Sequence, residues 1–266
     1  MSPYFSSWAD FFYDREKLKT LQDFTHEHTY ITNQRLNYRQ IIRKFFIVIL
    51  FTEYLIFPLF FNWKRFIFSF THWNLIITHI SIYLTFNAAK DTINFKRNFD
   101  KCENYQQAFK KVVVHHLFYS ATFIMNLMVV TIYWIYLHDK AIVYCKTDEV
   151  SRILPVTIYQ GRMFYLYTVH IIPGIACLIN VLITNCVLKI NFFGVISFIG
   201  VIYGIVNYIF SKKTGIILYW FLDHRKGLIT YGLNLTIIII TAFIAYFIIC
   251  KIERIFKRDL GKKKVE

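Results

Sequence analysis

Six long apolar runs, separated by polar segments, dominate the hydrophobic pattern of this 266-residue chain. Each run has about 17 to 26 residues, the length that an α-helix needs to cross ~30 Å of hydrocarbon. The runs lack the alternation of membrane β-strands, and helices satisfy all their backbone polar groups within one segment. We therefore predict an all-α polytopic membrane helical bundle with six transmembrane helices, over residues 45–61, 66–86, 112–137, 163–188, 192–210 and 229–250.

The polar segments between the runs predict how the bundle is oriented. Six spans place both termini on one side, and the segments on that side carry 21 Lys and Arg against 10 in the other loops. Positive charge is enriched on the cytosolic side, so we expect both termini in the cytosol of an endomembrane or plasma-membrane protein. The chain then divides into a cytosolic segment 1–44, a membrane domain 45–250 and a basic cytosolic tail 251–266.

Composition supports the membrane interpretation and excludes a nucleic-acid partner. The chain is 56% hydrophobic and 20% aromatic, too apolar for a soluble domain of this length. Its net charge of +15 is distributed between the apolar runs and at the C-terminus, not along a soluble basic face. This distribution predicts contacts with anionic lipid headgroups of the bilayer.

Polar residues inside two of the runs recur at helical spacing, so each set shares one helix face. Such faces turn inward in a membrane bundle, where polar side chains bond across helices. For most of these residues ordinary helix packing is the default interpretation. The two faces comprise Thr71, Asn74, Thr78, Ser81 and Thr85 in the second run, and His170, Gly174, Cys177, Asn180 and Thr184 in the fourth.

His170 is the exception, because an ionisable group at membrane depth is costly and marks a functional site by default. Thr71 and His170 lie roughly 8 and 10 Å from the outer ends of their runs. A hydroxyl and an imidazole at matched depth can form a nucleophile–base pair. An oxyanion donor is also needed, for which Asn74 or backbone amides near Pro173 or Gly215 are candidates.

Two further residues near the outer boundary, Tyr219 and Asp223, could orient His170 or shape the entrance, or form an ordinary loop-to-helix hydrogen bond. The remaining intramembrane groups allow other interpretations. Glu53 and His79 lie at similar depth and could neutralise each other. A metal cluster with His115 or His116 fits no ligand spacing, and paired haem ligands (His72 with His170, His79 with His115) are a remote alternative. We expect neither a metal nor a cofactor.

Four stretches within residues 45–250 form a set of motifs. They are Phe70-Thr71-His72-Trp73-Asn74-Leu75, the segment 134–144 with Trp134 to Lys140, His170 followed ten residues later by Asn180, and Thr214-Gly215 with Tyr219-x-Phe221-Leu222-Asp223-His224. In sequence and order they resemble the family of androgen-induced and androgen-dependent TFPI-regulating proteins, which are membrane threonine hydrolases, and more distantly rolling stone-like proteins. Asn180 stands where relatives carry an acidic residue.

The resemblance implies a multi-pass hydrolase of fatty acid esters of hydroxy fatty acids, with Thr71 as nucleophile and His170 as its base. The supporting residues would then be Asn74, Asn180, Tyr219 and Asp223. The expected partner is a lipid substrate that enters laterally between helices, at a site facing the lumenal or extracellular leaflet. The alternative hypothesis is a non-catalytic membrane adaptor or cell-fusion protein built on the same bundle.

Overall fold

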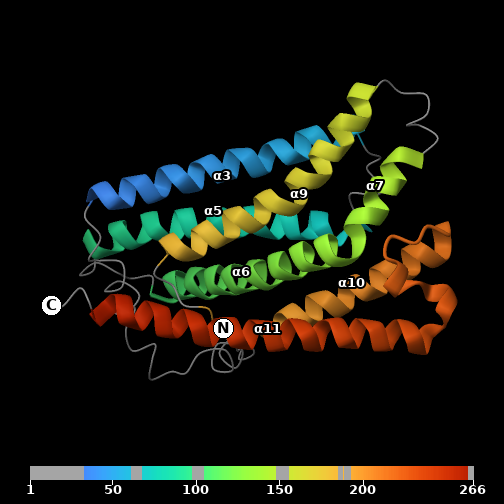
Figure 1. Cartoon of the computed structure of the whole chain (residues 1–266). Helices are drawn as coiled ribbons and strands as arrows, with labels where there is room; N and C mark the ends of the chain where they lie inside the picture. Colours follow the sequence, from blue (N-terminus) through green and yellow to red (C-terminus); the bar gives the residue numbers. More distant parts are fainter. Residues whose placement is uncertain are drawn as a thin grey trace.

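In the part of the chain that the structure describes, six long helices run side by side along one axis (Figure 1). The computed structural model describes residues 33–60, 68–97, 105–147, 156–184, 188 and 193–262. Within these ranges the chain is helical and contains no strand, which confirms the all-α bundle. The ends of the predicted cytosolic segments, residues 1–32 and 263–266, lie outside the described residues.

Each predicted run corresponds to one long helix that continues beyond the run at one end at least, although α9 ends at Ile183, before the predicted end of its run at residue 188. A helix need not end where the chain leaves hydrocarbon, because its backbone hydrogen bonds are internal. The basic tail accordingly continues the last helix, at least to Lys262. The long helices are α3 (Asn33–Phe60), α5 (Phe70–Arg97), α6 (Tyr105–Ile132), α9 (Val156–Ile183), α10 (Phe193–Thr214) and α11 (Leu228–Lys262).

Helix α6 lies between two groups of helices. It packs against α5 and α9 on one side, which also contact α3, and against α10 and α11 on the other (Figure 1). Its end changes geometry: a π-helical turn, η2 (Tyr133–Leu137), leads directly into α7 (His138–Thr147). This single helix therefore contributes to the packing of both groups.

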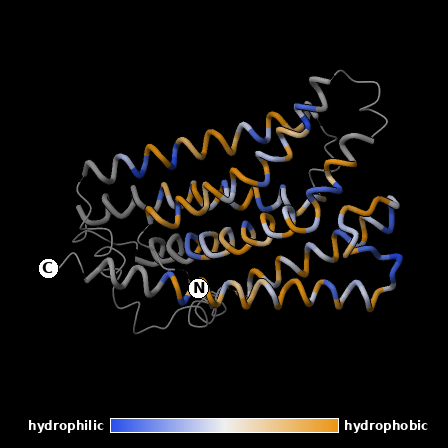
Figure 2. Tube along the Cα trace, viewed as in Figure 1, coloured by the Kyte–Doolittle hydropathy of each residue, from blue (hydrophilic) through white to orange (hydrophobic). Residues whose placement is uncertain are grey.

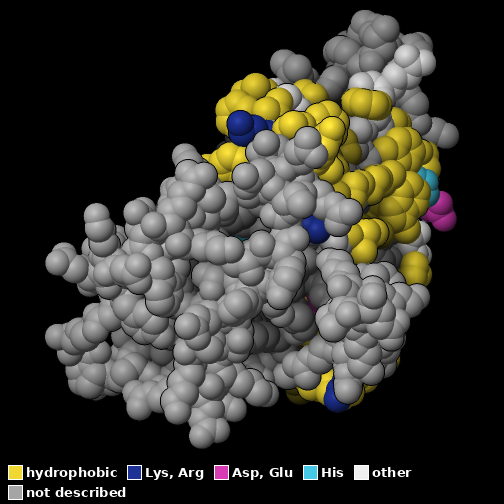
Figure 3. Space-filling model, turned by 90° about the vertical axis from the view of Figure 1, so that its left-hand side faces the viewer, with side chains coloured by type: hydrophobic (Ala, Val, Ile, Leu, Met, Phe, Trp, Pro, Cys, Tyr) yellow, Lys and Arg dark blue, Asp and Glu magenta, His cyan; other side chains and the backbone are white. Residues whose placement is uncertain are grey.

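Polar side chains are buried in the bundle while large apolar ones face outward, the arrangement of a membrane protein. On α3, for example, Arg43 and Glu53 are buried, whereas Phe45, Val48 and Leu55 are exposed. Hydrophobic positions extend along the helices (Figure 2). They also make up most of the described surface in the end view (Figure 3).

Three helices within the described residues are long and apolar enough to cross a membrane. These are 114–143, 160–183 and 228–253. Their length and composition support an integral membrane protein.

The connection between α10 and α11 folds back over one end of the bundle, at the right of Figure 1. This cap segment, residues 215–227, contains the 3-10 turns η4 (Trp220–Leu222) and η5 (His224–Lys226). Its two terminal residues, Gly215 and Gly227, have positive φ angles of 71° and 93°, which favour glycine. The cap segment lies at the same end as the start of α5 and the π-helical turn, and there the site is built.

Candidate active site

The predicted pair is in contact. Thr71 Oγ1 lies 3.1 Å from His170 Nε2, and both side chains are only 7% exposed. Thr71 is the second residue of α5, while His170 lies in the middle of α9. Direct packing of α5 against α9 at this depth brings together two residues 99 positions apart.

The second ring nitrogen of His170 fixes the direction of this hydrogen bond. His170 Nδ1 lies 2.6 Å from the carbonyl oxygen of Leu166, one turn earlier in α9. A carbonyl oxygen can only accept, so Nδ1 carries the proton. In the neutral imidazole Nε2 is then the acceptor, and the Thr71 hydroxyl donates to it. This is the tautomer that a general base for Thr71 requires.

Tyr133 holds the His170 ring from one face. The two rings are stacked, with centroids 3.6 Å apart and planes within 14°. Tyr133 is the first residue of the π-helical turn and is 2% exposed. A π-helical turn inserts an extra residue into the helical repeat and is frequent at functional sites. Here the turn presents Tyr133 to the imidazole and Leu137 to the neighbouring cavity.

A cavity of about 510 Å³ adjoins the pair and is covered by the cap segment. We call it the outer cavity. Its walls are mainly apolar. Thr71 and His170 belong to its lining, together with three charged residues, Lys140, Asp223 and Arg225. Cavities of this size, apolar with a few polar groups, are typical of small-molecule sites.

Tyr219 connects the cap segment to the start of α5. Its hydroxyl accepts a hydrogen bond of 3.1 Å from the backbone N–H of Phe70, the residue before Thr71. Tyr219 also lines the outer cavity beside the pair. The predicted loop-to-helix hydrogen bond is therefore present, and it places a phenol next to the candidate nucleophile.

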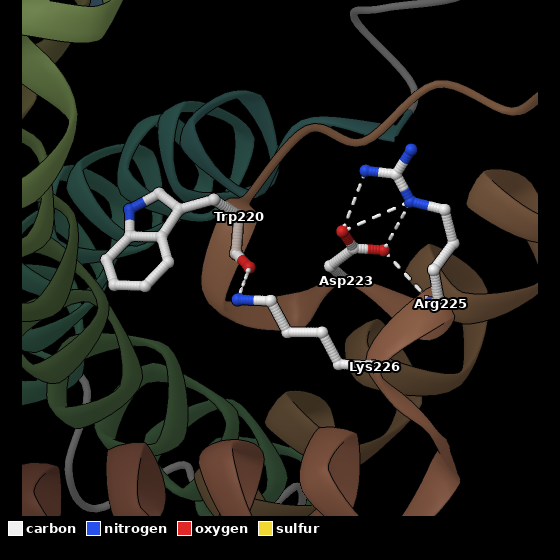
Figure 4. A network of polar contacts seen from close by, with 4 residues as sticks. All are labelled: Trp220, Asp223, Arg225 and Lys226. Carbon is white, nitrogen blue, oxygen red and sulfur yellow. Dashed lines mark hydrogen bonds and ion pairs between the residues drawn. The ribbon is translucent and has the colours of Figure 1, made fainter.

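Asp223 shapes the outer cavity but does not hydrogen-bond to His170, whose Nδ1 is already bound to Leu166. Its carboxylate instead forms an ion pair of 2.8 Å with Arg225 and accepts from the Arg225 backbone N–H (Figure 4). The side-chain hydrogen bond from Arg225, and to a smaller extent the backbone one, lower the pKa of Asp223 to about 2. In the same segment Lys226 Nζ donates to Trp220 O. From α7, Lys140 Nζ lies 4.4 Å from the Trp220 ring centroid.

Two predicted supporting residues lie away from the outer cavity. Asn74 is fully buried between α5 and α6, where its amide donates to Asn126 Oδ1 at 2.8 Å. Asn180 is ten residues beyond His170 in α9, about 15 Å along the helix. There its carbonyl oxygen accepts from the buried Arg43, and its amide donates to Thr85. Both are helix-packing residues in this structure.

Neither Pro173 nor Gly215 itself offers a free backbone N–H as an oxyanion donor. Pro173 has no N–H, so it frees a carbonyl of α9, which cannot donate. The N–H of Gly215 already donates to Ser211 O at 2.9 Å.

The other intramembrane groups have separate partners. Glu53 accepts from the Thr168 hydroxyl at 3.3 Å, and His79 stacks on Tyr54 with centroids 5.7 Å apart, so the two do not neutralise each other. His72 hydrogen-bonds to Tyr165 at 2.9 Å. Among the described residues, no three His, Cys, Asp or Glu side chains are grouped to hold a metal.

Sequence reasoning missed Tyr133, Leu166 and Lys140 as parts of this site. The helical period gave no signal for Tyr133, because the π-helical turn shifts the register at that residue. Lys140 lies three residues after the end of the turn, and only the fold of the cap segment places it beside the cavity. A carbonyl such as that of Leu166 leaves no trace in a sequence.

Comparison with known proteins gave no relative: the chain matches no family model, no curated protein and no solved structure.

Proposed function

We propose that this protein is a membrane-embedded hydrolase of lipid esters, with Thr71 as nucleophile and His170 as general base. The observation that carries the proposal is the hydrogen bond from the Thr71 hydroxyl to His170 Nε2, in the lining of an apolar cavity. A Thr hydroxyl is a weak nucleophile unless a base lies within hydrogen-bond reach, and here the base lies 3.1 Å away.

The chemistry follows the order of an acyl transfer. As Thr71 Oγ1 attacks the ester carbonyl carbon, His170 Nε2 takes the hydroxyl proton. The resulting imidazolium gives that proton to the leaving alcohol, and the acyl group stays on Thr71. Water then attacks the acyl-threonine with His170 again as base, which releases the fatty acid and restores the Thr71 hydroxyl.

The tetrahedral intermediate in each half of this reaction carries an oxyanion that needs a donor. Tyr219 is suited to this role, because its hydroxyl is fixed beside Thr71 by the Phe70 N–H. Thr71 also lies in the first turn of α5, where the helix dipole favours negative charge. Tyr219 therefore replaces Asn74 as the proposed oxyanion donor.

The stacked Tyr133 ring fits the same proposal, because it restricts rotation of His170 about its own side-chain bonds. A base that is held in one orientation keeps the lone pair of Nε2 directed at Thr71. Orientation by the Leu166 carbonyl and by Tyr133 takes the place of the acidic third residue found in many triads.

The test compares the purified wild type with Thr71→Ala and His170→Ala, using lipid-ester turnover and labelling by a fluorophosphonate probe. We expect both variants to lose turnover and labelling, and Thr71→Ser to keep both. Thr52→Ala and His79→Ala are matched controls, since Thr52 bonds only within α3 and His79 stacks on Tyr54. Wild-type turnover that survives both site substitutions would refute the proposal and favour the non-catalytic adaptor or fusion protein.

A further inference from the structure

A second cavity of about 390 Å³ runs between α6 and α11, on the other side of the pair from the outer cavity. We call it the α6–α11 groove. Its lining includes Leu127 and Thr131 of α6, and Thr241 and Ala245 of α11. Ile135 and Ile237, which also line it, are 66% and 59% exposed, so the groove opens on the outside of the bundle.

The groove exists because α6 and α11 meet only along part of their length. Tyr119 and Ile124 of α6 share one buried cluster with Ala242 and Tyr246 of α11, and Ala242 also lines the groove. On its other side α11 is held against α10, where the Tyr231 hydroxyl donates to Gly204 O at 2.7 Å. The α6–α11 groove therefore lies on the side of α11 that faces α6.

A small cavity lies between the groove and the pair, and we call it the passage. It measures about 50 Å³ and is lined by Thr71, Tyr133 and His170, which also line the outer cavity. At its other end it shares Met128, Ile132, Phe221 and Ile238 with the groove. Thr71 thus stands at the junction between a cavity with charged residues and an apolar groove.

We propose that the α6–α11 groove binds the acyl chain of the substrate and measures its length, while the outer cavity receives the alcohol part. This inference rests on the proposed function and names its substrate class: esters of long-chain fatty acids with a polar alcohol. After the alcohol leaves Thr71, the acyl chain stays in the groove, and water reaches the acyl-threonine through the outer cavity.

The dimensions of the groove agree with this occupant. From Asn234 to Ala245, both of which line it, α11 advances about 16 Å. The passage meets the groove at Ile238, and Ala245 lies seven residues beyond it, about 10 Å farther along α11, so the groove can take the distal part of an acyl chain. Thr241 lies between them, three residues from Ile238.

These two positions allow a graded test of chain length. Ala245→Phe fills the far end of the groove, and Thr241→Phe blocks it nearer the pair. With p-nitrophenyl butyrate, laurate and palmitate, we expect Ala245→Phe to lower kcat/KM for palmitate about tenfold and to leave butyrate unchanged. Thr241→Phe should lower kcat/KM for laurate as well as for palmitate. Ile244→Phe is the control, since Ile244 is 54% exposed on the same helix and does not line the groove.

Labelling separates the possible failures. Retained labelling of each variant by a short-chain fluorophosphonate shows that it is folded with an intact pair. If such a variant hydrolyses butyrate and palmitate in the wild-type ratio, the groove contacts only bilayer lipid and this inference is wrong. If the wild type hydrolyses none of the three esters and is not labelled, the proposed function itself has failed.

Discussion

Tyr133 lies face to face with His170, with ring centroids 3.6 Å apart. The contact joins the π-helical turn after α6 to the middle of α9, so the imidazole is held between a ring and the Leu166 carbonyl. A histidine fixed in this way loses little orientational freedom when it accepts a proton. The stack therefore predicts that Tyr133 positions the base without taking part in bond breaking.

Replacing the Tyr133 ring tests this positioning role. Tyr133→Phe keeps the stack and should retain most of the turnover. Tyr133→Leu frees the imidazole to rotate, and we expect kcat to fall about tenfold or more, since small misplacements of catalytic groups are costly. Steady-state kinetics on a lipid ester measures both. Equal activity of the Leu and Phe variants would show that the stack is a packing contact only.

The Tyr219 hydroxyl predicts a separation between kcat and KM. Without it the oxyanion loses a donor, so Tyr219→Phe should lower kcat about 100-fold with little change in KM. Tyr231→Phe is the matched control, because the Tyr231 hydroxyl donates to Gly204 O at 2.7 Å and Tyr231 lines neither the outer cavity nor the passage. We expect that control to lower the melting temperature more than kcat. A change in KM with kcat unchanged in Tyr219→Phe would contradict the assignment.

Asn180 should matter for stability and not for turnover. It supplies an acceptor to the buried Arg43 guanidinium, at 3.2 Å from Nε. Asn180→Leu removes that acceptor, and we expect a loss of about 1–3 kcal/mol in the free energy of unfolding. Turnover per fluorophosphonate-labelled molecule should stay at the wild-type value. A specific loss of kcat in folded protein would instead return Asn180 to the active site.

Close packing of α10 on α11 predicts a contrast between two glycines of α10. A Cβ added at Gly204 would lie 2.6 Å from Leu235 Cδ2, whereas one at Gly200 would lie 3.9 Å from its nearest neighbour, Ile239. The gain in helix propensity is the same for both, so it cancels in the comparison. We expect Gly204→Ala to be less stable than Gly200→Ala by about 1–3 kcal/mol in detergent unfolding. Equal stabilities would mean that Leu235 moves aside freely.

The ion pair of Asp223 should keep its contribution to stability until strongly acidic conditions. The folded pKa of Asp223, about 2, lies below its ordinary value, so its contribution to stability is fully present above the unfolded pKa of about 3.9. It is lost as the pH falls from there through about 2. The difference in melting temperature between wild type and Asp223→Asn should thus shrink between pH 5 and pH 3. A difference that stays unchanged over that interval would contradict this.

Depth and helix period predict that Thr71 and His170 lie at similar depth on inward faces, but only the structure shows that the two side chains are in contact. The same period could not separate these residues from Asn74 and Asn180, because all four lie on inward faces. What distinguishes them is position along the helix: Thr71 and His170 reach a cavity under the cap segment, whereas Asn74 reaches only Asn126. The cavity depends on how residues 215–227 fold. The hydrophobic pattern of so short a connection predicts no such geometry.

The hydrogen bond from His170 Nδ1 to Leu166 has a consequence for the origin of such sites. Every histidine in a continuous α-helix has a carbonyl one turn behind it, so the correct tautomer here is supplied by the helix itself. No acidic neighbour has to be acquired before the imidazole can serve as a base. The bundle sets the crossing angle and the axial offset between α5 and α9. A single hydroxyl on the facing helix then completes the pair. A non-catalytic helical membrane protein is therefore a small number of substitutions away from an arrangement of this kind.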